Sequence, residues 1–78
     1  MDPIIGQIKL FPYNFAPVGW QVCEGNLIPI SENDALFSLI GTTYGGDGEQ
    51  TFALPNLKGK VPGMHYCIAM SGIFPSRD

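Results

Sequence analysis

Short stretches of alternating hydrophobic and polar residues recur along this chain, and this pattern is typical of half-buried strands. The first stretch runs from Ile4 to Phe11 and places Ile8 and Leu10 on one side and Lys9 on the other. Further strands are predicted at residues 20–24, 27–30, 51–54 and 65–70. Glycine, proline or asparagine separates most of them, which favours short strands joined by turns.

The segments between these strands carry strong turn signals. Gly25 and Asn26 separate the second strand from the third, so the sequence CEGNLI predicts a tight hairpin. Pro12 and Pro17 bracket an irregular segment, because proline fits neither a helix interior nor a central strand. Three glycines at residues 45–48 predict a turn between the only helix and the fourth strand.

One helix is predicted, over about residues 32–40. Ser31 is suited to the N-cap, since its hydroxyl can accept a hydrogen bond from an amide of the first turn. Gly41 is suited to end the helix in a left-handed conformation. The expected buried stripe follows helical spacing and consists of Leu36, Leu39 and Ile40.

The order of these elements predicts an α+β fold, in a small single domain of residues 1–78 with short, mainly antiparallel strands and one helix. A chain of this size buries only roughly 60–65 % of its unfolded surface. Hydrophobic residues make up 45 % of the chain and charged residues only 14 %, against about 25 % charged in an average soluble protein. We therefore expect part of the apolar surface to be buried between subunits of a homo-oligomer.

The charge pattern and the length of the apolar runs argue against nucleic-acid binding and membrane insertion. The net charge is −3, and only Lys58 and Lys60 cluster among the basic residues, so we expect no nucleic-acid binding. No apolar run approaches the ~20 residues that cross a bilayer, so we expect no membrane insertion. No N-terminal signal is visible, and we expect synthesis in the cytoplasm.

The residue types that carry chemistry are few. Cys23 and Cys67 form no metal-binding pattern and are predicted to be buried thiols, with a disulfide as the alternative. A nucleophilic pair of Cys23 with His65, the only histidine, is not expected. A metal held by His65 from three copies is an alternative to a packed or partly exposed histidine.

The acidic residues also have structural interpretations. Asp47 and Glu49 could contribute to a calcium loop, but a tight turn with solvated acids is the favoured interpretation. Glu24, Glu32 and Asp34 are the candidates for a glycosidase carboxylate pair, and each is typical of a turn or a helix start. We therefore predict no catalytic residue, no cofactor and no metal, and we predict that the protein is not an enzyme.

Aromatic residues are the remaining candidates for recognition. A sugar-stacking platform is one interpretation of four of them, and a core or subunit interface is the favoured alternative. The four are Tyr13, Phe15, Trp20 and Tyr44. Tyr13 and Tyr44 lie near predicted turns, so they are the candidate ligand contacts. Lys58 and Lys60 are expected to form at most surface ion pairs.

Three motifs together resemble a known family. They are PVGWQVCEG at residues 17–25, LFSLIGTTYGGDG at 36–48 and FALPNLKGKVP at 52–62. This combination resembles the phage tail collar domain, which is found in tail fibre proteins and in the related bacterial microcystin-dependent proteins. The resemblance extends over nearly the whole chain.

The resemblance implies a non-enzymatic structural module of a phage tail fibre or a phage-tail-like particle, made in the bacterial cytoplasm. It implies a homo-oligomer, with a trimer as the expected form, that builds or caps the fibre and contacts other tail or baseplate proteins. Binding of a cell-surface glycan in host recognition is the alternative function. Longer relatives have a glycine-rich and variable region where this chain runs directly from Val61 to His65, and this shortening favours a scaffold.

Overall fold

Two small antiparallel sheets and one α-helix form the part of the chain described by the computed structural model, residues 2–75. This architecture confirms the predicted α+β class. The elements in chain order are β1 (Ile8–Phe11), β2 (Trp20–Val22), β3 (Leu27–Pro29), the 3₁₀ helix η1 (Ile30–Glu32), α1 (Asp34–Ile40), β4 (Thr51–Ala53) and β5 (His65–Ala69).

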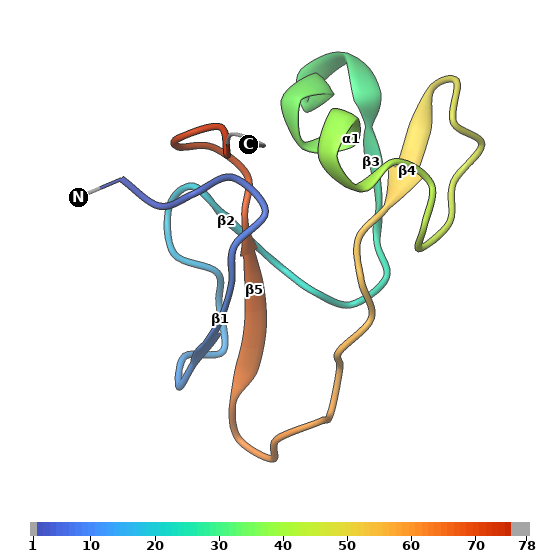
Figure 1. Ribbon diagram of the computed structural model, residues 1–78. Helices are drawn as coiled ribbons and strands as arrows, with labels where there is room; N and C mark the ends of the chain where they lie inside the picture. Colours follow the sequence, from blue (N-terminus) through green and yellow to red (C-terminus); the bar gives the residue numbers. More distant parts are fainter. Residues whose placement is uncertain (1, 76–78) are drawn as a thin grey trace.

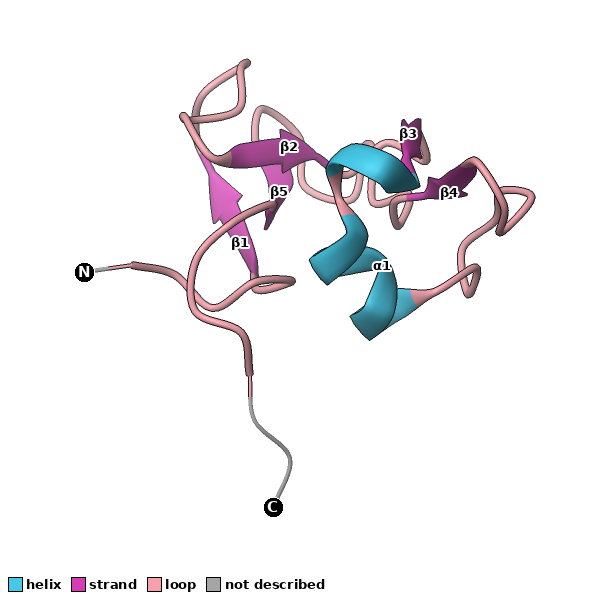
Figure 2. Cartoon of the chain, turned by 90° about the horizontal axis from the view of Figure 1, so that it is seen from above, coloured by secondary structure: helices cyan, strands magenta, loops and turns pink. Residues whose placement is uncertain are grey.

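The two sheets combine strands that are distant in the sequence. One sheet has the order β1-β5-β2, and the other pairs β3 with β4. The last strand, β5, therefore lies between the first two, and Figure 1 shows it running beside β1. Seen from above, β3, β4 and α1 lie to one side of the three-stranded sheet (Figure 2). The chain therefore crosses between the sheets after β2 and returns before β5.

The core lies where α1 and β4 meet β5. Leu36, Phe52 and Leu54 have no exposed surface, and Ile68 is 1 % exposed. The rings of Phe37 and Phe52 pack at 5.3 Å between centroids. Each buried aliphatic or aromatic side chain of this kind stabilises the fold by about 1.5–3 kcal/mol relative to an exposed one. The predicted stripe on the helix is confirmed, with Leu36 at its centre.

The first strand begins at Ile8, four residues later than predicted. Gln7 N donates to Ile4 O at 3.0 Å, and Gly6 has a φ of 87°, as in the third position of a type II turn. Gly6 N donates to Ala69 O and Gln7 O accepts from Ala69 N, each at 2.9 Å. Two residues thus oppose one, which is a β-bulge, and the bulge interrupts the alternation that the sequence shows from Ile4 onward.

The predicted hairpin at CEGNLI is wrong, because β2 and β3 belong to different sheets. The segment between them bonds instead to residues that precede β5: Gly25 N donates to Pro55 O, and Leu54 N donates to Asn26 O. Glu24 forms an isolated antiparallel bridge with Asn56. The Gly-Asn pair therefore marks a crossing between sheets rather than a two-residue turn.

The helix is shorter at its start than predicted, and the predicted N-cap is wrong. Ser31 lies within η1, and Asn33 is the N-cap of α1, without a side-chain hydrogen bond to the first turn. The side chain of Asn33 instead donates to Pro29 O at 3.0 Å. The 3₁₀ turn uses the residues that were expected to begin the α-helix.

Gly41 ends α1, as predicted, but in a different conformation. Its φ of 55° is positive while its ψ is −141°, which is the second position of a type II′ turn rather than the left-handed helical region. Thr43 N closes this turn onto Ile40 O at 3.3 Å. Only glycine adopts this combination readily, so the position is more restrictive than a left-handed cap.

The two ends of the described chain lie together. Ile73 forms a parallel bridge with Ile4, Ile5 N donates to Ile73 O at 2.9 Å, and Ile73 N donates to Pro3 O at 2.8 Å. The segment after β5 is therefore attached to the start of the chain as far as Ile73, and residues 76–78 lie outside the described residues. Within residues 2–75, no helix has the length and apolar character to cross a membrane.

Candidate binding surface

Four aromatic side chains form a continuous row on the three-stranded sheet and the loop after β1. Trp20 meets Phe11 edge-on at 5.2 Å between centroids, and Phe11 stacks on Tyr13 at 5.9 Å. Tyr13 in turn stacks on Phe15 at 5.3 Å with an interplanar angle of 19°. We call Trp20, Phe11, Tyr13 and Phe15 the aromatic row.

The sheet register explains how this row forms. Phe11 pairs with His65, Trp20 pairs with Ala69, and Cys67 lies between the two partners on β5. Paired residues in antiparallel strands project from the same face. Since cysteine and alanine are small, the rings from the two outer strands can lean over β5 and meet there. Cys67 and Ala69 have no exposed surface.

The outer end of the row is open to solvent. Tyr13 is 45 % exposed, Phe15 is 60 % exposed, and the nearby Val18 is fully exposed. Phe11 and Trp20 are only partly exposed. The inner half of the row therefore covers the sheet, and the outer half is surface available to a partner or ligand.

Lys9 adds a charge beside this row. It pairs with Cys67 on the same face of the sheet, and its Nζ lies 6.0 Å from the centroid of the Trp20 ring. This distance is at the limit of a cation–π contact, worth about 0.5–1 kcal/mol at an exposed site. Lys9 forms no ion pair with any of the residues that the structure describes.

Of the two predicted ligand contacts, the structure places only Tyr13 in this row. Tyr44 is 52 % exposed and lies in the turn between α1 and β4. Figure 1 shows that turn and the loop after β1 on opposite sides of the molecule. Phe11 was not singled out in the sequence, although aromatic residues at positions 11, 13 and 15 have the period of two that places side chains on one face.

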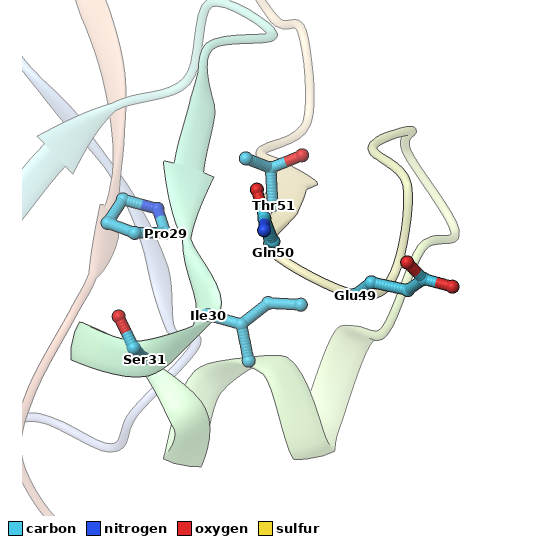
Figure 3. A pocket seen from close by; sticks show the side chains of 6 residues that line it. All are labelled: Pro29, Ile30, Ser31, Glu49, Gln50 and Thr51. Atoms are coloured by element: carbon cyan, nitrogen blue, oxygen red, sulfur yellow. The ribbon is translucent and has the colours of Figure 1, made fainter.

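A groove of about 560 Å³ lies between the start of η1 and the turn before β4. Figure 3 shows its lining, in which the side chain of Glu49 points away from the others. The groove is lined by Pro29, Ile30, Ser31, Glu49, Gln50 and Thr51. It contains a single carboxylate, whereas glycoside hydrolysis uses two across the scissile bond.

The other acids named above lie on separate elements. Glu24 bridges to Asn56, Glu32 belongs to η1, and Asp34 begins α1. Glu32 and Asp34 therefore occupy helical positions, as the sequence suggested, whereas Glu24 lies in the crossing between the sheets and not in a turn.

Asp47 organises the turn before β4. Its Oδ1 accepts hydrogen bonds from the amides of Glu49 and Gln50, each at 2.9 Å, and of Thr51 at 3.0 Å. These bonds lower the pKa of Asp47 to about 2, and the bond from the Thr51 amide makes the largest contribution to this shift. The geometry supports the tight-turn interpretation, and among residues 2–75 no three metal-ligating side chains gather as a metal site would require.

The two cysteines are buried free thiols, as predicted. Burial raises the pKa of Cys23 to about 11, with a further contribution from Cys67, and burial also raises the pKa of Cys67. A nucleophilic cysteine has a lowered pKa, so these shifts have the wrong sign for catalysis. His65 has a buried Nδ1 without a hydrogen-bond partner among the described residues.

The fold and its surfaces define a class of protein: a small two-sheet domain whose outstanding surface feature is exposed apolar and aromatic area. A comparison with protein families is consistent with this class, since the family described as the phage tail collar domain matches residues 6–62. The chain belongs to this family, which implies a structural component of the virion tail. No curated protein matches the chain.

Proposed function

We propose that this chain is a non-enzymatic module of a phage tail fibre or phage-tail-like particle, and that it forms a homotrimer that builds or caps the fibre. The observation that carries the proposal is the amount of exposed apolar surface on a domain of the tail collar family. Among residues 2–75, nine large hydrophobic residues are exposed: Ile4, Ile8, Tyr13, Phe15, Val18, Leu27, Tyr44, Ile73 and Phe74. Where such residues gather into a patch, they mark an interaction site.

Most of these exposed residues gather in two different patches. This arrangement favours contact between unlike surfaces of neighbouring copies. One group gathers where the two ends of the chain pair, around Ile4 and Ile73. A second group occupies the loop after β1, where Phe15 and Val18 project. Contacts between two different patches of neighbouring copies are heterologous, and such contacts close into a ring when the rotation is suitable. A trimer is the smallest such ring.

The molar mass in solution tests this proposal. By light scattering at micromolar concentration, we expect three times the chain mass of 8.5 kDa. Phe15→Ser should reduce the mass to that of the monomer, because it removes an apolar side chain from the patch on the loop after β1. The variant should still fold, since the Phe15 side chain is exposed and contributes little to the intramolecular core. Leu27→Ser is the matched control, since Leu27 is exposed to 61 % on the other sheet. A wild-type protein that is monomeric would refute the trimer.

A second candidate function is the recognition of a cell-surface glycan. The observation that favours it is the open outer end of the aromatic row, because sugar rings stack on aromatic faces. On a glycan array we expect binding that Tyr13→Ala abolishes. Tyr44→Ala tests the other predicted contact, which lies on a separate turn. An array without any bound glycan would count against this function and leave the structural role untouched.

A further inference from the structure

The backbone of β5 bonds alternately to its two neighbours. Tyr66 O accepts from Cys23 N at 2.9 Å, and Met70 N donates to Gly19 O at 2.8 Å, so these positions face β2. Ala69 bonds on the opposite side, to Gly6 and Gln7. By this alternation His65 and Cys67 also face β1, where their register partners are Phe11 and Lys9.

The remaining backbone groups of β1 face outward. Ile8 and Leu10 alternate with the bonded positions, so their N–H and C=O groups point away from β5. None of these four groups has a hydrogen-bond partner within the part of the chain that the structure describes. Figure 1 shows β1 as an outer strand of its sheet. The outer edge of β1 can therefore accept one more strand through backbone hydrogen bonds.

The side chains along the edge are apolar around one charge. Ile8 is 39 % exposed, Leu10 is half-buried, and Lys9 is exposed on the opposite face. Such an alternating edge suits a partner strand with apolar residues opposite Ile8 and Leu10. Lys9 has no acidic partner among residues 2–75, so an incoming strand can supply one.

A second copy of this chain is a poor occupant of the edge. Antiparallel self-pairing that uses all four free groups would place Ile8 opposite Leu10 and Lys9 of one copy opposite Lys9 of the other. Like charges directly opposite each other destabilise a strand pair. Lysine on an edge strand is also a common device against indiscriminate pairing. Lys9 therefore disfavours an incoming strand with a positive charge at the opposite position and favours one with a negative charge there.

We propose that the outer edge of β1 binds an extended strand of a different protein, in which a carboxylate lies opposite Lys9 and apolar residues flank it. Main-chain hydrogen bonds supply affinity in this mode of recognition, and the alternate side chains supply specificity. Self-association is not a premise of this proposal. Molar mass and amide exchange on β1 are separate measurements, so either proposal can fail without the other.

Amide hydrogen exchange of the full chain tests the proposal, followed residue by residue by NMR. The probe is a designed β-hairpin peptide whose open strand reads Thr-Ile-Glu-Val-Thr, added at millimolar concentration. We expect exchange at Ile8 and Leu10 to slow by about tenfold or more, as it does for amides that become hydrogen-bonded. The same hairpin with Lys in place of Glu should leave the exchange of both amides as fast as it is in the free protein.

Two variants control for fold and for charge. Ile8→Pro removes one outward donor but no bond to β5, so it should keep the fold and weaken binding, because proline is tolerated where an edge N–H faces solvent. Lys9→Pro is the matched control: it removes the inward donor and should destabilise the sheet. Lys9→Glu leaves the backbone unchanged and should reverse the preference, so that the Lys hairpin protects and the Glu hairpin does not.

Three results would overturn the proposal. Unchanged exchange at Ile8 and Leu10 with the Glu hairpin would show that the edge does not accept a strand. Equal protection by both hairpins would show that Lys9 does not select. Protection that rises with the concentration of the protein alone would show that a second copy occupies the edge.

Discussion

Glycine decides much of this structure at the scale of single residues. Each of the ten glycines in the chain adopts a positive φ, which other residues rarely do. The cost of replacing one depends on what surrounds it. At Gly46 a Cβ atom would collide with Phe52 Cα and lie 2.7 Å from Thr51 O, whereas at Gly59 it would meet nothing within 4 Å.

Gly46→Ala should therefore be among the most destabilising single changes in the loop. We expect a loss of about 3 kcal/mol, from backbone strain and from the collision with β4. Gly59→Ala, whose φ is also positive at 75°, should lose only about 1 kcal/mol through strain. Urea unfolding measures both. Equal losses would show that the loop at Gly46 moves away from β4 at little cost.

Asp47 should make the free energy of unfolding depend on pH in the acid range. Its pKa is lowered to about 2 in the folded chain by the amides of the turn, so its ionised form is favoured by folding. This contribution is fully present above the ordinary carboxyl pKa near 4 and is lost as the pH falls through about 2. Urea unfolding between pH 5 and pH 2 should show this loss, and Asp47→Asn should flatten it. If Asp47→Asn leaves the pH dependence of unfolding unchanged, the loss of stability in acid comes from other groups.

The sequence allowed some single-residue roles to be predicted and concealed others. Buried thiols at Cys23 and Cys67 followed from the absence of a metal-binding pattern around either cysteine. The three amide bonds to Asp47 were less visible, because an acid between glycines is equally compatible with a solvated turn. The contact of Phe11 with Trp20 required knowledge that β5 lies between them, and no local pattern contains that information.

At the scale of elements, the ends of the helix show how local signals compete. Asn33, Ser31 and Asp34 are all suitable N-cap residues, and the preceding 3₁₀ turn determines which one is used. Gly41 is unambiguous as the C-terminal stop because no other residue nearby tolerates a positive φ. The extent of α1 was therefore predictable at its end and not at its start.

Gly41→Val tests the conformation at that end. We expect a loss of about 2–3 kcal/mol, since a β-branched residue is strained at a φ of 55° and a ψ of −141°. Gly41→Asn should not restore stability, because asparagine favours the left-handed helical region, where ψ is positive. Thermal unfolding followed by circular dichroism measures both. Full stability of the asparagine variant would mean that the backbone relaxes into an ordinary left-handed cap.

Strand positions were predicted well, but strand partners were not. Five strands occur close to the expected ranges, yet β2 pairs with β5 and β3 pairs with β4. A tight turn favours local pairing by only a small amount, and burial of the apolar faces of both sheets outweighs it. Pairing between distant strands is set by this global burial, which a single sequence does not display.

At the scale of the whole molecule, the fold combines a small core with much apolar surface. Buried side chains gather between α1, β4 and β5, while most of the exposed hydrophobic residues lie on the loop after β1 and beside the paired ends of the described chain. The low charge content in the sequence indicates this division, because a domain of this size has too little interior for its apolar residues. Which surfaces carry them follows only from the arrangement of the sheets.

The pairing of Pro3 and Ile5 with Ile73 has a consequence for chain connectivity. Because these residues lie side by side, a short glycine linker that joins a position before Pro3 to one after Ile73 should close the chain into a circle that can be reopened elsewhere. Opening at Gly59, where the turn is exposed, should give a folded permutant with wild-type circular dichroism. Opening between Gly46 and Asp47 should fail, because it cuts the turn that holds β4. By the same geometry, a longer protein can accommodate this domain as an insertion within one of its loops.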